Sequence, residues 1–233
     1  MEIKIGLENC RIIFLSPHHD DMIYSSAITI RSLIDRHCDI TNINFFTRSS
    51  WHAANNDCSI EENSNERLAE EQKMSQILGF KTLSMGLDDS SVRGLDAFSE
   101  LTQECNPVEL DKISEKFVKA LYISEYDFAF VPLTVGKHID HKYVRETAER
   151  LFPQDRIIYY EDMPYTERGE DSLTYVPEGL NYILFEGDFS KKIFDIQIYK
   201  SQIEKKNIEK MKKYGSGIVN GKYVERIWTR AIL

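Results

Sequence analysis

Short apolar runs alternate with amphipathic stretches along most of the chain. Residues 11–15 form a run that is continuously apolar after its opening arginine. Such a run is typical of a strand that is covered on both faces in a parallel sheet. Apolar side chains then recur at spacings of four, three and four, at Ile23, Ala27, Ile30 and Ile34. This spacing predicts one buried face of a helix, so the expected opening unit is a strand, a tight loop and a helix.

The same alternation continues through the middle of the chain. Further strands are expected at 40–46, 81–85, 128–133 and 157–160, and the last of these is expected to close the series. Strands that alternate with helices predict an α/β fold, here a Rossmann-like three-layer sandwich with a mostly parallel sheet.

Helix ends and helix faces support this reading. A helix is expected to end near Gly79, because glycine suits a left-handed cap, and another to begin at Asn106-Pro107. Between residues 190 and 213 the apolar positions Ile193, Ile196, Tyr199 and Ile203 keep helical spacing among many lysines. This stretch is expected to form a packed helix with a solvated outer face.

Composition limits the class of protein. With 233 residues, of which 42% are hydrophobic, the chain is expected to form a single domain over 1–233. A formal net charge of −9 argues against nucleic acid or an anionic membrane as a partner. The sequence has no apolar stretch long enough to span a membrane and no apolar core of a signal peptide near its start, so a cytoplasmic location is expected. The scattered cysteines are expected to be reduced thiols.

Two polar clusters follow predicted strands. Residues 17–21, Pro-His-His-Asp-Asp, come directly after the first strand, and residues 138–141, His-Ile-Asp-His, come shortly after the strand that ends at Leu133. Ligands of open α/β sheets bind beyond the carboxyl ends of the strands. If the two strands are neighbours, both clusters contribute to one site.

The residue types in these clusters suit a catalytic metal. Imidazole and carboxylate groups are good ligands for zinc, and a catalytic zinc site uses three protein ligands and leaves one position open. The adjacent carboxylates of Asp20 and Asp21 offer one metal ligand and one general base. Two alternatives remain at this point. The aspartates, including Asp140, are also suited to capping the helices that follow them, and two histidines with one carboxylate also form the facial triad of iron enzymes.

The motifs resemble those of the LmbE-like, or PIG-L, family of zinc-dependent N-acetylglucosaminyl deacetylases. The resemblance rests on a His-x-Asp-Asp motif at 18–21 and, later in the chain, a His-x-Asp-His motif at 138–141. A third match is Arg-Leu-Ala-Glu at 67–70, followed by Leu78-Gly79. The pairing of the first two motifs in this order gives the resemblance its specificity.

The resemblance implies a role for each matching residue. It implies His18, Asp21 and His141 as ligands of Zn²⁺, with Fe²⁺ as the alternative metal, and Asp20 as the general base. It implies that His138 stabilises the oxyanion or protonates the leaving amine.

Three neighbouring positions complete this picture. The resemblance implies that Asp140 orients His138 and that Arg67 contacts the substrate. His19 stands where the family often has proline or leucine, and a role on the surface or behind the metal ligands is expected for it.

The function implied is hydrolysis of an N-acetyl group from an amino sugar or sugar conjugate, a small-molecule substrate. The alternatives are an iron enzyme that uses the same triad and a non-catalytic sugar-binding domain with a vestigial metal site. Long loops at 47–62, 86–105 and 162–179 are expected to shape the binding site, with Trp51, His52 and Tyr165 as candidate pocket residues. The sequence leaves the exact substrate, the physiological metal and the oligomeric state open.

Overall fold

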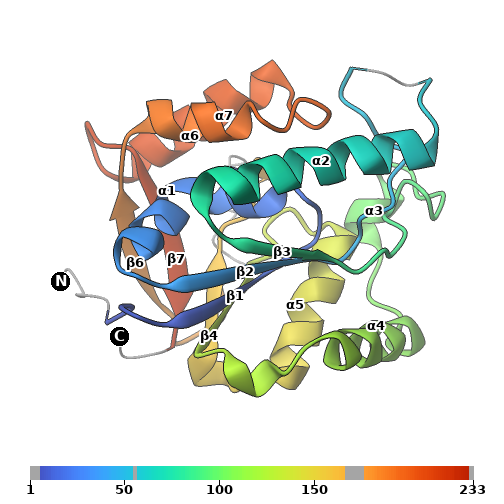
Figure 1. Ribbon diagram of the computed structural model, residues 1–233, viewed down its shortest axis with the longest axis horizontal. Helices are drawn as coiled ribbons and strands as arrows, with labels where there is room; N and C mark the ends of the chain where they lie inside the picture. Colours follow the sequence, from blue (N-terminus) through green and yellow to red (C-terminus); the bar gives the residue numbers. More distant parts are fainter. Residues whose placement is uncertain (1–5, 55–56, 166–175, 231–233) are drawn as a thin grey trace.

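A twisted, seven-stranded sheet forms the centre of the computed structural model, which describes residues 6–54, 57–165 and 176–230 (Figure 1). The strand order is β3-β2-β1-β4-β5-β7-β6. The strands are β1 (Arg11–Ser16), β2 (Asp39–Asn44), β3 (Lys81–Ser84), β4 (Phe128–Pro132), β5 (Ile157–Tyr160), β6 (Asn181–Glu186) and β7 (Val224–Thr229).

The sheet is mostly parallel, as the sequence predicts. Strands β3, β2, β1, β4 and β5 pair in parallel, whereas β7 pairs antiparallel with both β5 and β6. The expectation that 157–160 closes the series is therefore wrong, because two antiparallel strands extend the sheet beyond it. In β7 the charged residues Glu225 and Arg226 interrupt the apolar pattern that marks the parallel strands.

Helices cover both faces of the sheet (Figure 1). The hydrophobic core on one face includes residues of α1, α2, α6 and α7, and the core on the other face includes residues of α4 and α5. The helices are α1 (Asp21–Asp35), α2 (Ile60–Leu78), α3 (Ser99–Thr102), α4 (Pro107–Ala120), α5 (Ile139–Leu151), α6 (Phe189–Ile196) and α7 (Lys205–Ile218), with short 3₁₀ turns η1 (Ile123–Glu125) and η2 (Gln154–Arg156).

The position of β1 between the two helical layers explains why its sequence is apolar without interruption. Successive side chains of a strand point to opposite faces. Ile12 and Phe14 belong to the core beneath α1, whereas Ile13 and Leu15 belong to the core against α4 and α5. Both faces of β1 are therefore shielded from water. The strand ends at Ser16, directly before the first polar cluster at 17–21.

The helix end predicted at Gly79 and the helix start predicted at Asn106 are both observed, and α2 also begins with a cap that the sequence analysis did not predict. Ser59 and Glu62 form a reciprocal capping box at the start of α2, and Gly79 ends this helix with φ 82°. The side chain of Asn106 accepts hydrogen bonds from two backbone amides at the start of α4.

The helix expected between 190 and 213 is instead two helices, α6 and α7, joined by residues 197–204. The helical spacing is misleading because Tyr199 is buried for a different reason. Its hydroxyl donates a 2.6 Å hydrogen bond to Glu71 of α2, which anchors the connecting segment.

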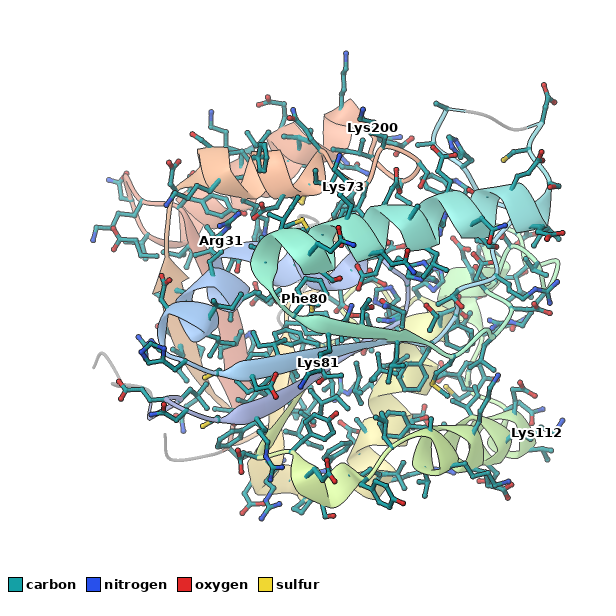
Figure 2. All side chains as sticks on the ribbon, in the orientation of Figure 1. Arg31, Lys73, Phe80, Lys81, Lys112 and Lys200 are labelled. Carbon is teal, nitrogen blue, oxygen red and sulfur yellow. The ribbon has the colours of Figure 1, made fainter. Side chains whose placement is uncertain are left out.

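Charged side chains cover the outside of the molecule (Figure 2). Lys73, Lys112 and Lys200 are exposed, Phe80 is buried beneath α2, and Arg31 of α1 pairs with Asp195 of α6 at 2.6 Å. In the described part of the chain, no helix is long and apolar enough to cross a membrane.

Candidate functional site

The two polar clusters meet at the carboxyl edge of the sheet. Strands β1 and β4 are parallel neighbours, so the loops that follow them lie side by side. Nε2 of His18 lies 3.0 Å from a carboxylate oxygen of Asp140, and Nε2 of His141 lies 3.5 Å from Oδ1 of Asp21. The sequence expectation that these loops share one site is therefore confirmed.

Three ligand atoms face a common point between these loops. His18, Asp21 and His141 each offer one ligand atom, and the three atoms lie within 4.8 Å of one another. Nδ1 of His18 lies 3.1 Å from Oδ2 of Asp21. Nε2 of His141 is buried and has no hydrogen-bond partner, which is costly unless a ligand occupies its lone pair. Two imidazoles and one carboxylate, with Nε2 of His141 left unpaired, fit a divalent cation such as zinc.

The imidazoles of His18 and His141 each contact a further carboxylate through the ring nitrogen that faces away from the candidate metal site. Asp162 lies 2.6 Å from Nδ1 of His141, and Asp140 lies 3.0 Å from Nε2 of His18. Because a carboxylate accepts, the ring N–H of each pair faces Asp162 or Asp140, and the opposite nitrogen of each ring is the one that would bind a cation. Asp162 was missed by the sequence analysis, although its place two residues after β5 at the same sheet edge was an available signal.

The carboxylate of Asp140 bonds to His18, whereas Asp140 reaches His138, the residue it was expected to orient, through its backbone amide. Its carboxylate also accepts from Arg93 at 2.6 Å and from the backbone amide of Ser90 at 3.0 Å. Its closest approach to the Nδ1 atom of His138 is 4.0 Å. His18, His138 and Asp140 also offer ligand atoms close together, but these partners already occupy the Asp140 carboxylate.

His138 caps the start of helix α5 and faces a second carboxylate. Its Nδ1 accepts a hydrogen bond from the backbone amide of Asp140 at 3.2 Å, so Nε2 carries the proton. Nε2 lies 3.5 Å from Glu100 of α3 and 3.5 Å from the hydroxyl of Ser90. Glu100 was also missed by the sequence analysis, because nothing in the sequence links the 86–105 loop to His138.

The adjacent aspartates are in different electrostatic states. Burial and the charge of Asp21 raise the pKa of Asp20 to about 7. Burial opposes ionisation of Asp21 as well, but His141 and His18 lower the pKa of Asp21 to about 2. Asp20 makes no capping hydrogen bond at the start of α1, so the helix-cap alternative does not account for it. One carboxylate of the pair is permanently charged, and the other exchanges a proton near neutral pH.

His19 turns away from this group. Its Nε2 lies 3.1 Å from the hydroxyl of Ser84 at the end of β3. Burial and the charge of Arg67 lower the pKa of His19 to about 3, so its ring is neutral.

A cavity of about 290 Å³ opens over the cluster. Trp51 and Tyr165 line it as expected, whereas His52 does not and instead faces Glu66 at 3.3 Å. Part of the 162–179 loop, residues 166–175, lies outside the described residues. The lining residues are His18, Asp20, Asp21, Tyr24, Trp51, Arg67, Asp89, Ser90, Ser91, Glu100, His138, Met163, Pro164, Tyr165, Gln202, Glu204 and Asn207.

Tyr165 closes over the loop that carries the second motif. A side chain at Gly136 would meet the Tyr165 ring at 2.4 Å, so only glycine permits this approach. The Tyr165 ring also makes an edge contact with the His141 ring, with centroids 5.5 Å apart.

The Arg-x-x-Glu stretch of α2 has two separate tasks. Arg67 lines the cavity, donates to the carbonyl oxygen of Trp51 at 2.6 Å and lies 5.5 Å from the centre of that indole ring. Glu70 points elsewhere and accepts from the backbone amide and hydroxyl of Ser201 at 2.8 and 2.6 Å. The motif thus joins the cavity wall to the C-terminal part of the chain.

Solved structures share the fold over almost the whole chain. The A40926 pseudoaglycone deacetylase Dbv21 is 21% identical, with a TM-score of 0.70 over 95% of this chain and 97% of that chain. A deacetylase of teicoplanin biosynthesis is 17% identical, with a TM-score of 0.74 over 94% of this chain and 96% of that chain. The N,N'-diacetylchitobiose deacetylase of Pyrococcus horikoshii is 17% identical, with a TM-score of 0.62 over 93% of this chain and 82% of that chain. At these identities the likeness establishes the fold alone.

Sequence comparison identifies the family. No curated protein matches the chain. The family model of the GlcNAc-PI de-N-acetylases, PIG-L, matches residues 13–152, which is more than half of the 233 residues and includes both motifs. The chain belongs to the PIG-L, or GlcNAc-PI de-N-acetylase, family.

Proposed function

We propose that the chain is a zinc-dependent N-deacetylase that removes the acetyl group from an amino sugar or sugar conjugate. The observation that carries the proposal is the unpartnered Nε2 of His141, which faces the Asp21 carboxylate, with a second aspartate, Asp20, on the same cavity wall. The fold supports it, because structures with this fold are described as deacetylases of teicoplanin biosynthesis and of diacetylchitobiose.

His18, Asp21 and His141 would hold the cation. Asp140 and Asp162 keep the two imidazoles in the tautomers that this task requires. When bound, the cation supplies Lewis-acid polarisation of water and of the acetyl oxygen.

Asp20 is the proposed general base. Its pKa of about 7 lets the carboxylate accept a proton from the attacking water at neutral pH. A permanently charged Asp21 next to it cannot take this role, because its pKa of about 2 makes it a poor proton acceptor.

His138 is the proposed partner of the reacting amide. Its Nε2–H reaches the cavity, where it is suited to donate a hydrogen bond to the oxyanion of the tetrahedral intermediate or a proton to the departing amine. Glu100 lies 3.5 Å from this nitrogen and helps to hold the ring in place. Collapse of the intermediate breaks the C–N bond and yields acetate and a free amine.

The proposal is tested by acetate release from the metal-loaded protein with N,N'-diacetylchitobiose, N-acetylglucosamine and N-acetylglucosamine glycosides. Asp20→Asn is expected to lower kcat at least about a hundredfold while zinc content stays unchanged. Asp111→Asn, the same change at an exposed position of α4, serves as the control. If the wild-type protein releases no acetate from any of these substrates, the deacetylase assignment is wrong, and near-normal turnover of Asp20→Asn refutes the base.

The same assay separates the competing functions. A hydrolase keeps its activity in the absence of oxygen, whereas an oxygen-activating iron enzyme stops. A vestigial binding domain would take up the sugar and release nothing.

A further inference from the structure

Cys10 and Cys38 lie side by side at the amino ends of β1 and β2, at the edge of the sheet opposite the histidine–aspartate cluster. These strands are parallel neighbours whose register begins with Arg11 opposite Asp39, so the residues directly before them are also opposite each other (Figure 1). The backbone amide of Asp39 donates to the carbonyl oxygen of Cys10 at 2.9 Å, which continues the pairing through Cys10. Both cysteines pack in the core on the α1 face of the sheet, so their side chains share one face.

The spacing of the two cysteines suits a disulfide. Neighbouring strands lie about 4.8 Å apart, and the Cα atoms of disulfide-bonded cysteines lie about 4.4–6.8 Å apart. The two thiols already interact with each other. Each also donates to a backbone carbonyl, Cys10 to that of Glu8 at 3.4 Å and Cys38 to that of Leu7 at 3.5 Å. A sulfur–sulfur bond can therefore form without a change in strand pairing.

The two thiols differ in their access to solvent. Cys38 is buried, whereas Cys10 is half-buried, so a small reagent reaches Cys10 first. Burial raises the pKa of both thiols, which are therefore protonated at neutral pH and react slowly. Such a pair is suited to holding a redox state and not to rapid catalytic exchange.

Metal binding is the other common use of neighbouring thiols. Among the described residues, the groups that could hold a metal ion contain only histidine and aspartate. The thiolate, and not the thiol, is the form that binds a metal, and burial disfavours it at both cysteines. Oxidation is therefore the chemistry that this pair supports.

We propose that Cys10 and Cys38 form a reversible dithiol–disulfide pair that a small-molecule disulfide, such as glutathione disulfide, oxidises. The Cys10 thiolate attacks one sulfur of the reagent, which breaks its S–S bond and releases one glutathione. The Cys38 thiolate then attacks the Cys10 sulfur of the mixed disulfide and releases the second glutathione. The two thiol protons end on the released glutathiones, and the two electrons that the protein loses reduce the reagent. This inference is independent of the proposed deacetylase function.

The disulfide would close the chain between residues 10 and 38, which hold β1, α1 and the motif at 18–21. A cross-link of this kind stabilises a protein mainly by restricting its unfolded chain. The oxidised form is therefore expected to unfold roughly 10 °C above the reduced form. The redox state of the pair would thus set how firmly the segment with the first motif stays folded.

The test incubates the purified protein with glutathione disulfide, blocks the remaining thiols and digests the product with trypsin without reduction. Trypsin places Cys10 in the peptide 5–11 and Cys38 in the peptide 37–48. The expected product joins these two peptides and is lighter by two hydrogens than their sum. Dithiothreitol is expected to separate them again and to reverse the rise in unfolding temperature.

Two variants check the order of the steps. Cys38→Ser is expected to stop at the mixed disulfide on Cys10 without a rise in unfolding temperature, and Cys105→Ser, at another partly buried cysteine, to behave like wild type. Peptide mapping of the wild-type protein decides the question even if Cys38→Ser does not fold. Wild-type protein that yields no joined peptide, or that keeps glutathione on Cys10 without the second step, overturns the pair.

Discussion

The carboxylate of Asp162 lies 2.6 Å from Nδ1 of His141, on the side of the ring opposite the unpartnered Nε2. Asp162 also accepts from the backbone amide of Val135, so one carboxylate fixes both the loop after β4 and the tautomer of His141. The second nitrogen of the ring is thereby held ready for a cation.

Asp162→Asn is expected to weaken zinc binding about ten- to a hundredfold, because the amide holds the imidazole less firmly and makes it less basic. Competition with a chromogenic chelator measures the affinity. The exposed replacement Asp111→Asn is the control. Equal zinc affinity of Asp162→Asn and wild type would show that Asp162 does not support a metal ligand.

Glu100→Gln is expected to lower kcat about tenfold with zinc affinity unchanged. The hydrogen bond with His138 is the main cause that lowers the pKa of Glu100, so Glu100 is charged at neutral pH and its carboxylate helps to orient the Nε2–H of His138. Glu104→Gln, an exposed neighbour in the sequence, is the control. A drop in zinc content together with kcat would place Glu100 in the metal site instead of behind His138.

Activity is expected to rise with pH on the acid side of neutrality. Only the charged form of Asp20 accepts a proton, and its pKa of about 7 in the metal-free protein means that this form gains population as pH increases. A bound cation favours the carboxylate, so the inflection of kcat/KM is expected below 7. The apparent pKa taken from this profile belongs to Asp20 and the attacking water together, because interacting groups titrate as a pair. A rate that falls over the same range would contradict this role.

Lys192→Met is expected to lower the free energy of unfolding by about 3–5 kcal/mol, because it leaves the buried Glu225 carboxylate without its countercharge. Lys192 is fully buried, and its Nζ lies 2.7 Å from Glu225. The same carboxylate accepts from the amides of Ile28 and Thr29, just after the bend of α1. Denaturant unfolding measures the loss, and Lys191→Met at the exposed neighbouring position is the control. A loss no larger than that of the control would refute the buried ion pair.

The sequence was sufficient for the parallel part of the fold and for the meeting of the two motifs at one candidate site. The apolar runs of β1 and β4 are covered on both faces, so their pattern is unambiguous, and each is followed by its motif at the same sheet edge. Local sequence therefore positions both loops, and the pairing of the two strands brings them together.

The remaining features depend on contacts between distant segments. Strand β7 escapes prediction because the buried Glu225 is stabilised by Lys192 of α6, which no local pattern reveals. The support of His141 by Asp162 and of His138 by Glu100 likewise exists only in the folded chain. Gln202 has no motif around it, and the segment that carries it reads as helix.

The most direct test of the account is the metal content of the purified protein after dialysis against zinc and then against metal-free buffer. We expect one zinc ion per wild-type chain and a large loss of bound zinc in both His141→Ala and Asp21→Asn, with circular dichroism showing that the variants stay folded. Full zinc content in folded His141→Ala and Asp21→Asn would contradict the shared site of the two loops and, with it, the proposed hydrolase.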